Sequence, residues 1–543
     1  MEILFEIEYA DSVRLVCTSG ETLLEVARRG GIAIDAPCSG NGTCGKCKVK
    51  LLEGAAESAP SRHISPEDYA AGWRLACQTK AVGDCRVFVP ASAGAFRWDI
   101  RTAHGLLRET EQTLRKAGIP WENRGVAGVG CALDIGTTTV SGVLTNLETG
   151  EILAGASLGN GQIPYGADVI HRIIAQSRPG GKAALQQAIT EKTLVPLIAG
   201  LCRDAGIGPE TIARIVVAAN TTMNHLLLGE DANTIRIEPY IPAFLYRESV
   251  PAATLGLTGN PKAPVLLAPN VGAYVGGDIT AGVLANGMWN SDALTLFVDL
   301  GTNGELVLGN REFLLACACS AGPAFEGGDI SCGMRATCGA VEHITLDPDT
   351  LEPTMQVIGG GKPLGICGSG IIDLVAELFR HKVIDPKGRF RRDNPRIGQD
   401  AHGVGRYALA EGVFITEVDM DNFIRAKAAI YSGIETLLSS VDMTQDGVER
   451  VLIAGGIGSG IDIVNAISIG MLPNICREKY GYIGNSSLAG AYAMTMSDGA
   501  VAKCRELAEG MTYLELSTDP GYMDRFVAAC FLPHTRQELF GFL

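Results

Sequence analysis

Alternation of hydrophobic and polar positions at the start of the chain predicts a small domain of strands around one helix. Two strands, Ile3–Tyr9 and Val13–Cys17, flank a polar turn. The segment Glu21–Arg29 follows with its leucines at helical spacing. Further strands are predicted at Lys48–Leu52 and Cys85–Val89. The pattern is therefore that of a compact α+β domain.

The pattern changes after residue 90, and residues 91–128 are predicted to be a linker between domains. Small residues open it, and Ile100–Ala117 follows as a polar, charged helix that ends at Gly118. Two interpretations of this helix stay open. It is either a spacer that lets domain 1–90 swing, or a helix that packs on the domain that follows.

Beyond residue 128, buried strands lead twice into the same kind of turn. Val129–Leu144 and Leu296–Leu308 each contain a hydrophobic strand, the pattern Asp-hydrophobic-Gly-Thr and a second strand. A third hydrophobic strand, Val451–Ala454, runs into a glycine-rich turn and then a helix. The repeat predicts a duplicated domain, with one half at 129–290 and the other at 291–543.

Length and composition are those of a multidomain globular protein. The chain has 543 residues, of which 46% are hydrophobic and 19% are charged. Its net charge of −15 argues against nucleic-acid and anionic-membrane partners. The first residues do not resemble a signal peptide, and the most hydrophobic long window, Val451–Leu472, is broken by glycines. We therefore expect a cytoplasmic protein whose 16 cysteines are thiols or metal ligands.

Four cysteines of the first domain have the spacing of an iron–sulfur site. Cys38, Cys44 and Cys47 lie in one glycine-rich loop, and Cys77 follows after 29 further residues. Three thiolates from one loop and a fourth from afar make a four-thiolate cage for iron. A structural zinc site is the alternative, but such sites usually show two Cys-x2–4-Cys pairs, and here there is one. We predict a [2Fe–2S] cluster.

The two repeated turns have the chemistry of phosphate-binding loops. Glycine, hydroxyl and amide residues follow an aspartate in both: Asp134, Gly136, Thr137, Thr138 and Thr139 in the first, and Asp299, Gly301, Thr302, Asn303, Gly304 and Glu305 in the second. Such turns present N–H groups and hydroxyls to phosphate oxygens, and the aspartate can hold Mg²⁺ through water. One turn of this kind is a weak signal. Two of them, 165 residues apart, predict a nucleotide bound from both sides.

The third glycine-rich turn, at Gly455, Gly456 and Gly458, is predicted to approach the base and ribose of the nucleotide. A Rossmann site is the alternative. The glycines here are spaced G-x-G-x-G, whereas the Rossmann fingerprint is G-x-G-x-x-G within a βαβ unit. The P-loop pattern G-x-x-x-x-G-K-[ST] does not occur in the sequence.

In this order the three motifs resemble the actin-like ATPase superfamily of sugar kinases, actin and heat-shock chaperone ATPases. The resemblance implies that Asp134–Thr139 and Asp299–Glu305 are the phosphate loops and that Gly455–Gly458 is the adenosine loop. Asp278, in Gly276-Gly277-Asp278, matches a catalytic aspartate of glycerol-kinase-like enzymes and is predicted to orient or deprotonate the attacking water. A helix N-cap is the alternative for Asp278. Asp134, Asp278 and Asp299 are thus the predicted catalytic residues.

Two further segments are candidates with open interpretations. Gly365–Gly370 precedes a predicted helix, Ile371–Phe379, and either lines the nucleotide cleft or forms a tight start of the helix. Four cysteines surround Ser320–Asp329: Cys317, Cys319, Cys332 and Cys338. Their spacing matches no common metal site, so buried thiols beside the cleft are favoured over a second cluster.

The whole chain resembles the reductive activators of corrinoid proteins. The resemblance rests on the cluster loop Cys38–Cys47, on the two phosphate loops, and on Ser320–Gly327, which reads Ser-Ala-Gly-Pro-Ala-Phe-Glu-Gly. It implies an α+β and α/β multidomain fold: a β-grasp ferredoxin domain followed by a two-lobed actin-like ATPase with duplicated ribonuclease-H-like lobes. The first cysteine gap is five residues, as in adrenodoxin-like rather than plant-type ferredoxins.

The resemblance also implies a function, an ATP-dependent return of an oxidised Co(II) corrinoid protein to Co(I) for methyl transfer in anaerobic metabolism. The implied cofactors are a [2Fe–2S] cluster, ATP and Mg²⁺, and the implied partners are the corrinoid protein and an upstream electron donor; a homodimer is compatible with it. A plant-type cluster has a reduction potential of about −400 mV, so the reduction of a lower-potential corrinoid is uphill. ATP is expected to bias a conformational equilibrium that favours it.

Three alternative functions are weighed against this one. An activator of 2-hydroxyacyl-CoA dehydratases shares the ATPase fold, but it carries a [4Fe–4S] cluster that bridges a dimer and has no ferredoxin domain. A small-molecule kinase with an attached redox domain would phosphorylate an added substrate. A non-catalytic redox sensor would bind nucleotide without turnover, and the presence of all three aspartates argues against it.

Overall fold

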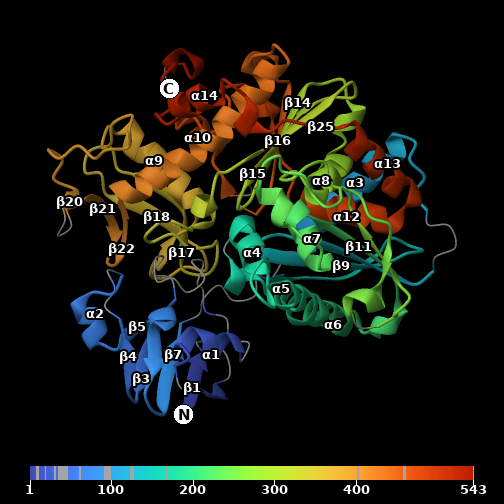
Figure 1. Cartoon of the computed structure of the whole chain (residues 1–543). Coiled ribbons are helices and arrows are strands. Elements are labelled where there is room, and N and C mark those ends of the chain that lie inside the picture. Colours follow the sequence, from blue (N-terminus) through green and yellow to red (C-terminus); the bar gives the residue numbers. More distant parts are fainter. Residues whose placement is uncertain are drawn as a thin grey trace. The chain divides into compact units, whose positions relative to one another are not determined.

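The computed structural model divides the chain into two compact units. The first comprises Met1–Phe96 with Gly161–Ala175, and the second comprises Arg97–Asn160 with Gln176–Leu543 (Figure 1). The structure describes all residues except 8–11, 19, 30–31, 33, 35–46, 60, 62, 91–99, 123–126, 167, 258, 400–402, 457–459 and 542–543.

A five-stranded mixed sheet forms the first unit, in the order β2-β1-β7-β3-β5. The strands are β1 (Glu2–Ile7), β2 (Val13–Val16), β3 (Lys48–Glu53), β5 (Trp73–Leu75) and β7 (Cys85–Val89), with a separate pair, β4 (Ala56–Ser58) and β6 (Thr79–Ala81). Strand β1 is antiparallel to β2 and parallel to β7. Helix α1 (Leu23–Arg29) buries Leu23 and Val26 in a core shared with Phe5 and Val87. A mixed sheet with one helix against it is the predicted β-grasp ferredoxin fold.

The second unit contains two six-stranded sheets, and the first has the order β10-β9-β8-β11-β13-β12. Its strands are β8 (Val129–Ile135), β9 (Thr139–Asn146), β10 (Ile152–Gly159), β11 (Ile212–Ala219), β12 (Val250–Pro251) and β13 (Pro264–Leu267). Consecutive strands β8, β9 and β10 are antiparallel neighbours. Strands β11 and β13 are added in parallel on the other side of β8.

In the other sheet, of order β24-β23-β14-β15-β16-β25, five strands repeat this plan, whereas the sixth, β25, lies at the opposite edge from β12. Its strands are β14 (Thr295–Leu300), β15 (Gly304–Gly309), β16 (Leu314–Cys319), β23 (Arg450–Ala454), β24 (Tyr480–Tyr482) and β25 (Thr512–Tyr513). Strands β14, β15 and β16 are antiparallel, and β23 and β24 are added in parallel beside β14. The shared topology of five strands confirms the predicted duplication.

Three helices from distant parts of the chain pack together in one core of the second unit. They are α3 (Ile100–Lys116), α8 (Gly277–Asn286) and α12 (Ser486–Met496). In α3, Leu107 and Leu114 are 2% and 0% exposed. The polar helix of the predicted linker is therefore packed on the domain that follows it, which is the second of its two interpretations.

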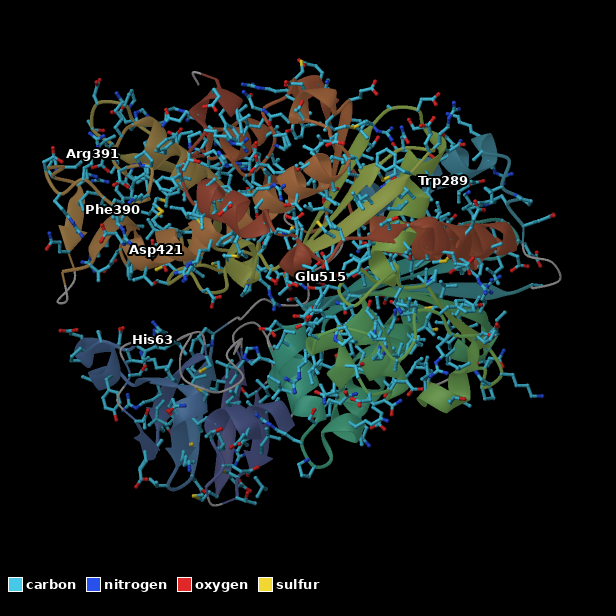
Figure 2. All side chains as sticks on the ribbon, turned by 45° about the horizontal axis from the view of Figure 1, so that its top comes forward. His63, Trp289, Phe390, Arg391, Asp421 and Glu515 are labelled. Carbon is cyan, nitrogen blue, oxygen red and sulfur yellow. The ribbon has the colours of Figure 1, made fainter. Side chains whose placement is uncertain are left out.

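The other helices and strands are drawn in Figures 1 and 2. The remaining helices are α2 (Pro66–Ala70), α4 (Val169–Gln176), α5 (Gly181–Ile189), α6 (Val195–Ala205), α7 (Thr221–Leu228), α9 (Gly368–Arg380), α10 (Glu417–Ser440), α11 (Ile463–Ser468), α13 (Asp498–Gly510) and α14 (Tyr522–Ala529). Two three-stranded sheets contain β17 (Ala340–Leu346), β18 (Pro353–Val357) and β19 (Gly365–Ile366), and β20 (Ile397–Gln399), β21 (Gly405–Ala410) and β22 (Val413–Thr416). None of the described helices is both long and apolar enough to cross a membrane.

Candidate functional site

Two of the four predicted cluster ligands meet in the core of the first unit. Cys47 precedes β3 and Cys77 follows β5, and the Ala76 N–H donates to the Cys47 carbonyl at 2.8 Å. Both thiols are buried, with their Sγ atoms 3.2 Å apart. Two thiolates on one tetrahedral metal, with metal–sulfur bonds of about 2.3 Å, stand roughly 3.7 Å apart, so this pair fits one iron of a cluster. Cys38 and Cys44 lie outside the described residues.

The surroundings of Cys77 differ from those of Cys85, a buried cysteine of the same unit. The Gln78 amide lies 3.8 Å from Cys77 Sγ, where it can donate a weak hydrogen bond to a thiolate. Burial raises the pKa of the Cys85 thiol to about 11, with help from the nearby Cys17 and Asp84. A thiol that holds its proton so firmly is a poor metal ligand.

The two predicted phosphate loops are the turns of matching hairpins, β8–β9 and β14–β15. In the first, the Gly136 N–H donates to the Thr139 carbonyl at 3.0 Å. In the second, the Gly301 N–H donates to the Asn303 carbonyl, also at 3.0 Å. A Cβ atom on Gly136 would stand 2.8 Å from the Thr139 carbonyl oxygen, so a side chain there would disturb the turn.

The structure brings the two loops together through their hydroxyl groups. Thr138 Oγ1 and Thr302 Oγ1 are 3.2 Å apart, although 164 residues separate them. Both hydroxyls also donate to the same carboxylate oxygen of Glu326, at 3.0 and 3.1 Å. Glu326 belongs to the Ser320–Gly327 motif, but sequence reasoning predicted no role for it in the site.

Two asparagines that sequence reasoning missed hold the first loop in place. The Asn160 side chain donates to the Gly136 carbonyl at 2.8 Å, and its N–H donates to the Thr138 carbonyl at 2.9 Å. The Asn220 amide contacts Thr137 Oγ1 at 3.3 Å. Asn220 is the N-cap of α7, so the first loop is anchored to the start of that helix.

Asp134, the first predicted catalytic residue, is fixed by the start of α12. Asn485, the N-cap of that helix, and Ser487 both donate to its carboxylate at 2.8 Å. Burial raises the pKa of Asp134, and these two hydrogen bonds oppose the rise. Asn485 and Ser487 are about 350 residues away along the chain, and no local spacing signals them.

Asp278 lies in the first turn of α8, at the end of a close helix–loop contact. Gly276 holds the N-cap position, so the alternative that Asp278 caps the helix is wrong. A Cβ on Gly276 would come within 2.4 Å of the Asn220 Cα, and one on Gly277 within 2.4 Å of the Ala268 carbonyl oxygen. The two glycines therefore let α8 begin against its neighbours, with Asp278 near the other carboxylates.

The carboxyl groups of the site are partly or fully buried, and they raise one another's pKa values. Desolvation, and then the charges of Asp299 and Asp134, raise the pKa of Asp278 to about 7. Desolvation and the charge of Asp134 raise the pKa of Asp299 to about 7 as well. Burial, followed by Asp278 and Asp299, raises the pKa of Glu305 well above its ordinary value. A buried group of carboxyls repelling one another suits a divalent cation that neutralises them.

The third glycine motif adjoins the second phosphate loop. Gly455 has φ +93°, and a Cβ there would stand 2.2 Å from the Leu300 carbonyl oxygen and 3.0 Å from Asp299 Oδ1. Gly456 faces open space, and Gly458 lies outside the described residues. The close approach of Gly455 puts the predicted adenosine loop beside Asp299.

The Gly365–Gly370 segment reaches the same region. A Cβ on Gly460, which follows the third motif, would stand 3.1 Å from Ser369 Oγ. Ser369 lies in the first turn of α9, because this helix begins at Gly368 rather than at the predicted Ile371. A Cβ on Gly370 would be 2.3 Å from the Val341 carbonyl oxygen, so this glycine serves close packing inside the helix. The segment therefore lies next to the adenosine motif.

The four cysteines around Ser320–Asp329 do not converge. Cys317 and Cys319 are buried on β16, Cys332 is partly buried near Gly412 and Cys338 is exposed. In the described part of the chain, these four cysteines belong to no group of three or more His, Cys, Asp or Glu side chains that could ligate a metal ion directly. The geometry gives no support for a second cluster at these cysteines.

Comparison with known proteins covers almost the whole chain. Residues 8–82 match the 2Fe-2S iron-sulfur cluster binding domain, residues 129–291 match the RACo middle region, and residues 293–543 match the C-terminal domain of RACo, the ASKHA domain. A solved structure described as a reductive activator for corrinoid, iron-sulfur protein is 37% identical, with a TM-score of 0.70 and coverage of 99% of both chains.

Two curated relatives carry related descriptions. The corrinoid activation enzyme RamQ of Eubacterium limosum is 34% identical over 415 residues, which are 73% of this chain and 69% of that protein. The [Co(II) methylated amine-specific corrinoid protein] reductase of Methanosarcina barkeri is 25% identical over 268 residues, which are 46% of this chain and 47% of that protein.

Proposed function

This chain belongs to the family of reductive activators of corrinoid proteins, and from this premise we propose that it uses ATP to pass low-potential electrons from its [2Fe–2S] domain to a Co(II) corrinoid protein. The product is the Co(I) form that methyl transfer requires. The observation that carries the proposal is the meeting of Thr138 and Thr302, from the two phosphate loops, at 3.2 Å. This contact joins the halves of an ATPase site in a chain that also carries a cluster domain.

We assign the chain's residues to the nucleotide as follows. The loop N–H groups and the hydroxyls of Thr137, Thr138, Thr139 and Thr302 bind phosphate oxygens, and Asp134 and Asp299 hold Mg²⁺ through water. Mg²⁺, when bound, neutralises phosphate charge. Asp278, whose pKa is raised to about 7, is suited to accept a proton from an attacking water near neutral pH.

We propose that Cys38, Cys44, Cys47 and Cys77 hold the cluster. When bound there, it supplies single electrons at low potential. The buried, adjoining thiols of Cys47 and Cys77 support this assignment. Burial excludes water from this side of the site, and the Gln78 amide is placed to stabilise the negative sulfur of Cys77.

The remaining assignments concern partners and organisation. We propose a corrinoid protein of a methyltransferase system as the target, an upstream electron donor, a homodimer, and a cytoplasmic location without nucleic-acid or membrane partners. The net charge of −15 supports the absence of nucleic-acid and anionic-membrane partners. We further propose domains at 1–90, 129–290 and 291–543, with 91–128 between the first and second.

An anaerobic reduction assay tests the function. The full chain is mixed with a low-potential reductant and a panel of Co(II) corrinoid proteins, and visible absorption is followed with and without Mg-ATP. We expect a Co(I) band to grow only with Mg-ATP and only with the correct partner. Steady ATP consumption without Co(I) from any partner would overturn the proposed target and favour a dehydratase-activator or kinase activity.

A further inference from the structure

The Glu326 carboxylate is hydrogen-bonded to both phosphate loops. It ends the short 3-10 helix Pro323–Glu326 and is half-buried. Its Oε2 atom accepts hydrogen bonds from Thr138 at 3.0 Å and from Thr302 at 3.1 Å. One oxygen of the Glu326 carboxylate thus accepts hydrogen bonds from both phosphate loops, although Glu326 itself belongs to the second lobe.

The chemistry of these hydroxyls creates a competition. Each threonine hydroxyl has one proton to donate, and in the proposed site a phosphate oxygen needs that proton. A phosphate and the Glu326 carboxylate are both negative acceptors, and they repel each other strongly in a partly desolvated site. Both acceptors therefore cannot hold Thr138 and Thr302 at the same time.

We propose that Glu326 is a positioning residue that binds the two loop hydroxyls in the nucleotide-free site and is displaced from them by the nucleotide's phosphates. The inference rests on the proposed ATP-binding function. When no nucleotide is bound, Glu326 joins a loop of one lobe to a loop of the other. When nucleotide binds, a phosphate oxygen replaces the carboxylate as the acceptor. The position of the Glu326 carboxylate therefore depends on whether nucleotide is bound.

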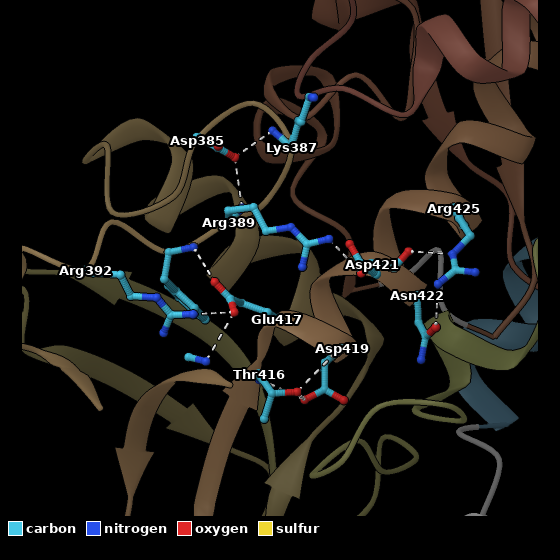
Figure 3. Close-up of polar contacts among 12 residues, drawn as sticks. Asp385, Lys387, Arg389, Arg392, Thr416, Glu417, Asp419, Asp421, Asn422 and Arg425 are labelled. Carbon is cyan, nitrogen blue, oxygen red and sulfur yellow. Dashed lines mark hydrogen bonds and ion pairs between the residues drawn. The ribbon is translucent and has the colours of Figure 1, made fainter. Parts of the chain in front are cut away.

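The segment after Glu326 links this exchange to the start of α10. A Cβ on Gly327 would stand 2.3 Å from the Met334 nitrogen, so the chain turns tightly there. Ser331 then donates through its N–H and its hydroxyl to Asp419, at 2.7 and 2.9 Å. The Asn422 side chain donates to the Asp329 carbonyl at 2.7 Å. Asp419 and Asn422 lie together in the first turns of α10 (Figure 3), so a shift of Glu326 is passed to this helix.

Nucleotide binding to Glu326→Gln tests the proposal. The amide keeps the size of the side chain but removes the charge that competes with phosphate. We expect a non-hydrolysable ATP analogue with Mg²⁺ to bind the full-length variant about tenfold more tightly than the wild type, as measured by calorimetry; tenfold corresponds to about 1.4 kcal/mol. Adenosine, which has no phosphate, should bind both proteins equally.

Glu449→Gln is the matched control, because it also removes one carboxylate charge. Glu449 directly precedes β23, whereas Gly455 directly follows it, so the change lies away from the nucleotide loops. Its affinity for the analogue should equal that of the wild type. Unchanged or weaker binding of the analogue by Glu326→Gln, with adenosine binding retained, would overturn the proposal. Glu326→Ala should show the same gain, and loss of adenosine binding in both Glu326 variants would also overturn the proposal, because Glu326 would then be part of the scaffold. A wild type that binds no adenine nucleotide would overturn the proposed function itself.

Discussion

Asp278 and Asp299 show how burial at a few positions sets the pH response of the protein. The pKa of each is raised to about 7, whereas an aspartate in an unfolded chain has a pKa near 3.8. Between these values the folded protein holds protons that the unfolded chain has released. The free energy of unfolding of the nucleotide-free protein therefore falls as pH rises from about 4 through about 7.

The variant Asp299→Asn should flatten this dependence. It removes one raised carboxyl and part of the repulsion on Asp278, so unfolding temperatures between pH 5 and 7 should fall less steeply than in the wild type. Lys427, whose pKa burial lowers to about 7, acts in the opposite direction but only above that pH. Equal slopes for the two proteins would show that Asp299 is ionised throughout the range. Asp292→Asn, at an exposed aspartate, is the control.

Cysteine substitutions separate ligands from buried thiols. Cys77→Ser should remove the visible absorption of the cluster, because it takes away one of two adjoining sulfurs, and should leave nucleotide binding unchanged. Cys85→Ser should keep the absorption, since the raised pKa of Cys85 marks a thiol that stays protonated. Spectra of the anaerobically purified proteins decide the matter. A normal spectrum in Cys77→Ser would refute the proposed ligand set.

Local spacing predicted some site residues and missed others for a physical reason. The aspartates and glycines of the loops lie within one turn, where sequence neighbours are neighbours in space. Glu326 and Asn485 act on Thr138 and Asp134 from 188 and 351 residues away. Only the closed fold brings such pairs together. The glutamate in Ser320–Gly327 was visible as part of a motif, but nothing local linked it to the loops.

At the scale of elements, the duplication was predictable and the role of the linker helix was not. Hydrophobic strands around a repeated turn predicted a duplicated domain, and five strands of the two sheets share one topology. Helix α3 gave an ambiguous signal because it is polar along most of its length. Its buried contacts depend on Leu107 and Leu114, which are spaced seven residues apart.

Leu114→Ala tests the packing of α3. Removing a fully buried leucine side chain leaves a cavity, and we expect the free energy of unfolding to fall by about 2–5 kcal/mol. Glu109→Ala, on the exposed side of the same helix, should change it little. Urea unfolding followed by circular dichroism measures both. Equal stability of the two variants would indicate a helix that does not pack.

For the whole molecule, charge is distributed unevenly along the chain. Residues 380–406 contain eight Lys or Arg and three Asp or Glu, a net charge of 8 − 3 = +5, within a chain of net charge −15. Several of these groups pair locally, as Arg389 does with Asp421 and Arg392 with Glu417 (Figure 3). Arg391 is exposed (Figure 2). This segment is a local exception to the acidity of the chain.

The buried carboxyl groups also change how the charge of the molecule should be counted. The value of −15 treats every Asp and Glu as ionised, yet Asp278, Asp299 and Glu305 all have raised pKa values. Near neutral pH these carboxyl groups therefore hold protons when no cation is bound, and a cation that binds there releases the protons into the solution. The heat of Mg-ATP binding therefore includes the ionisation enthalpy of whichever buffer accepts them.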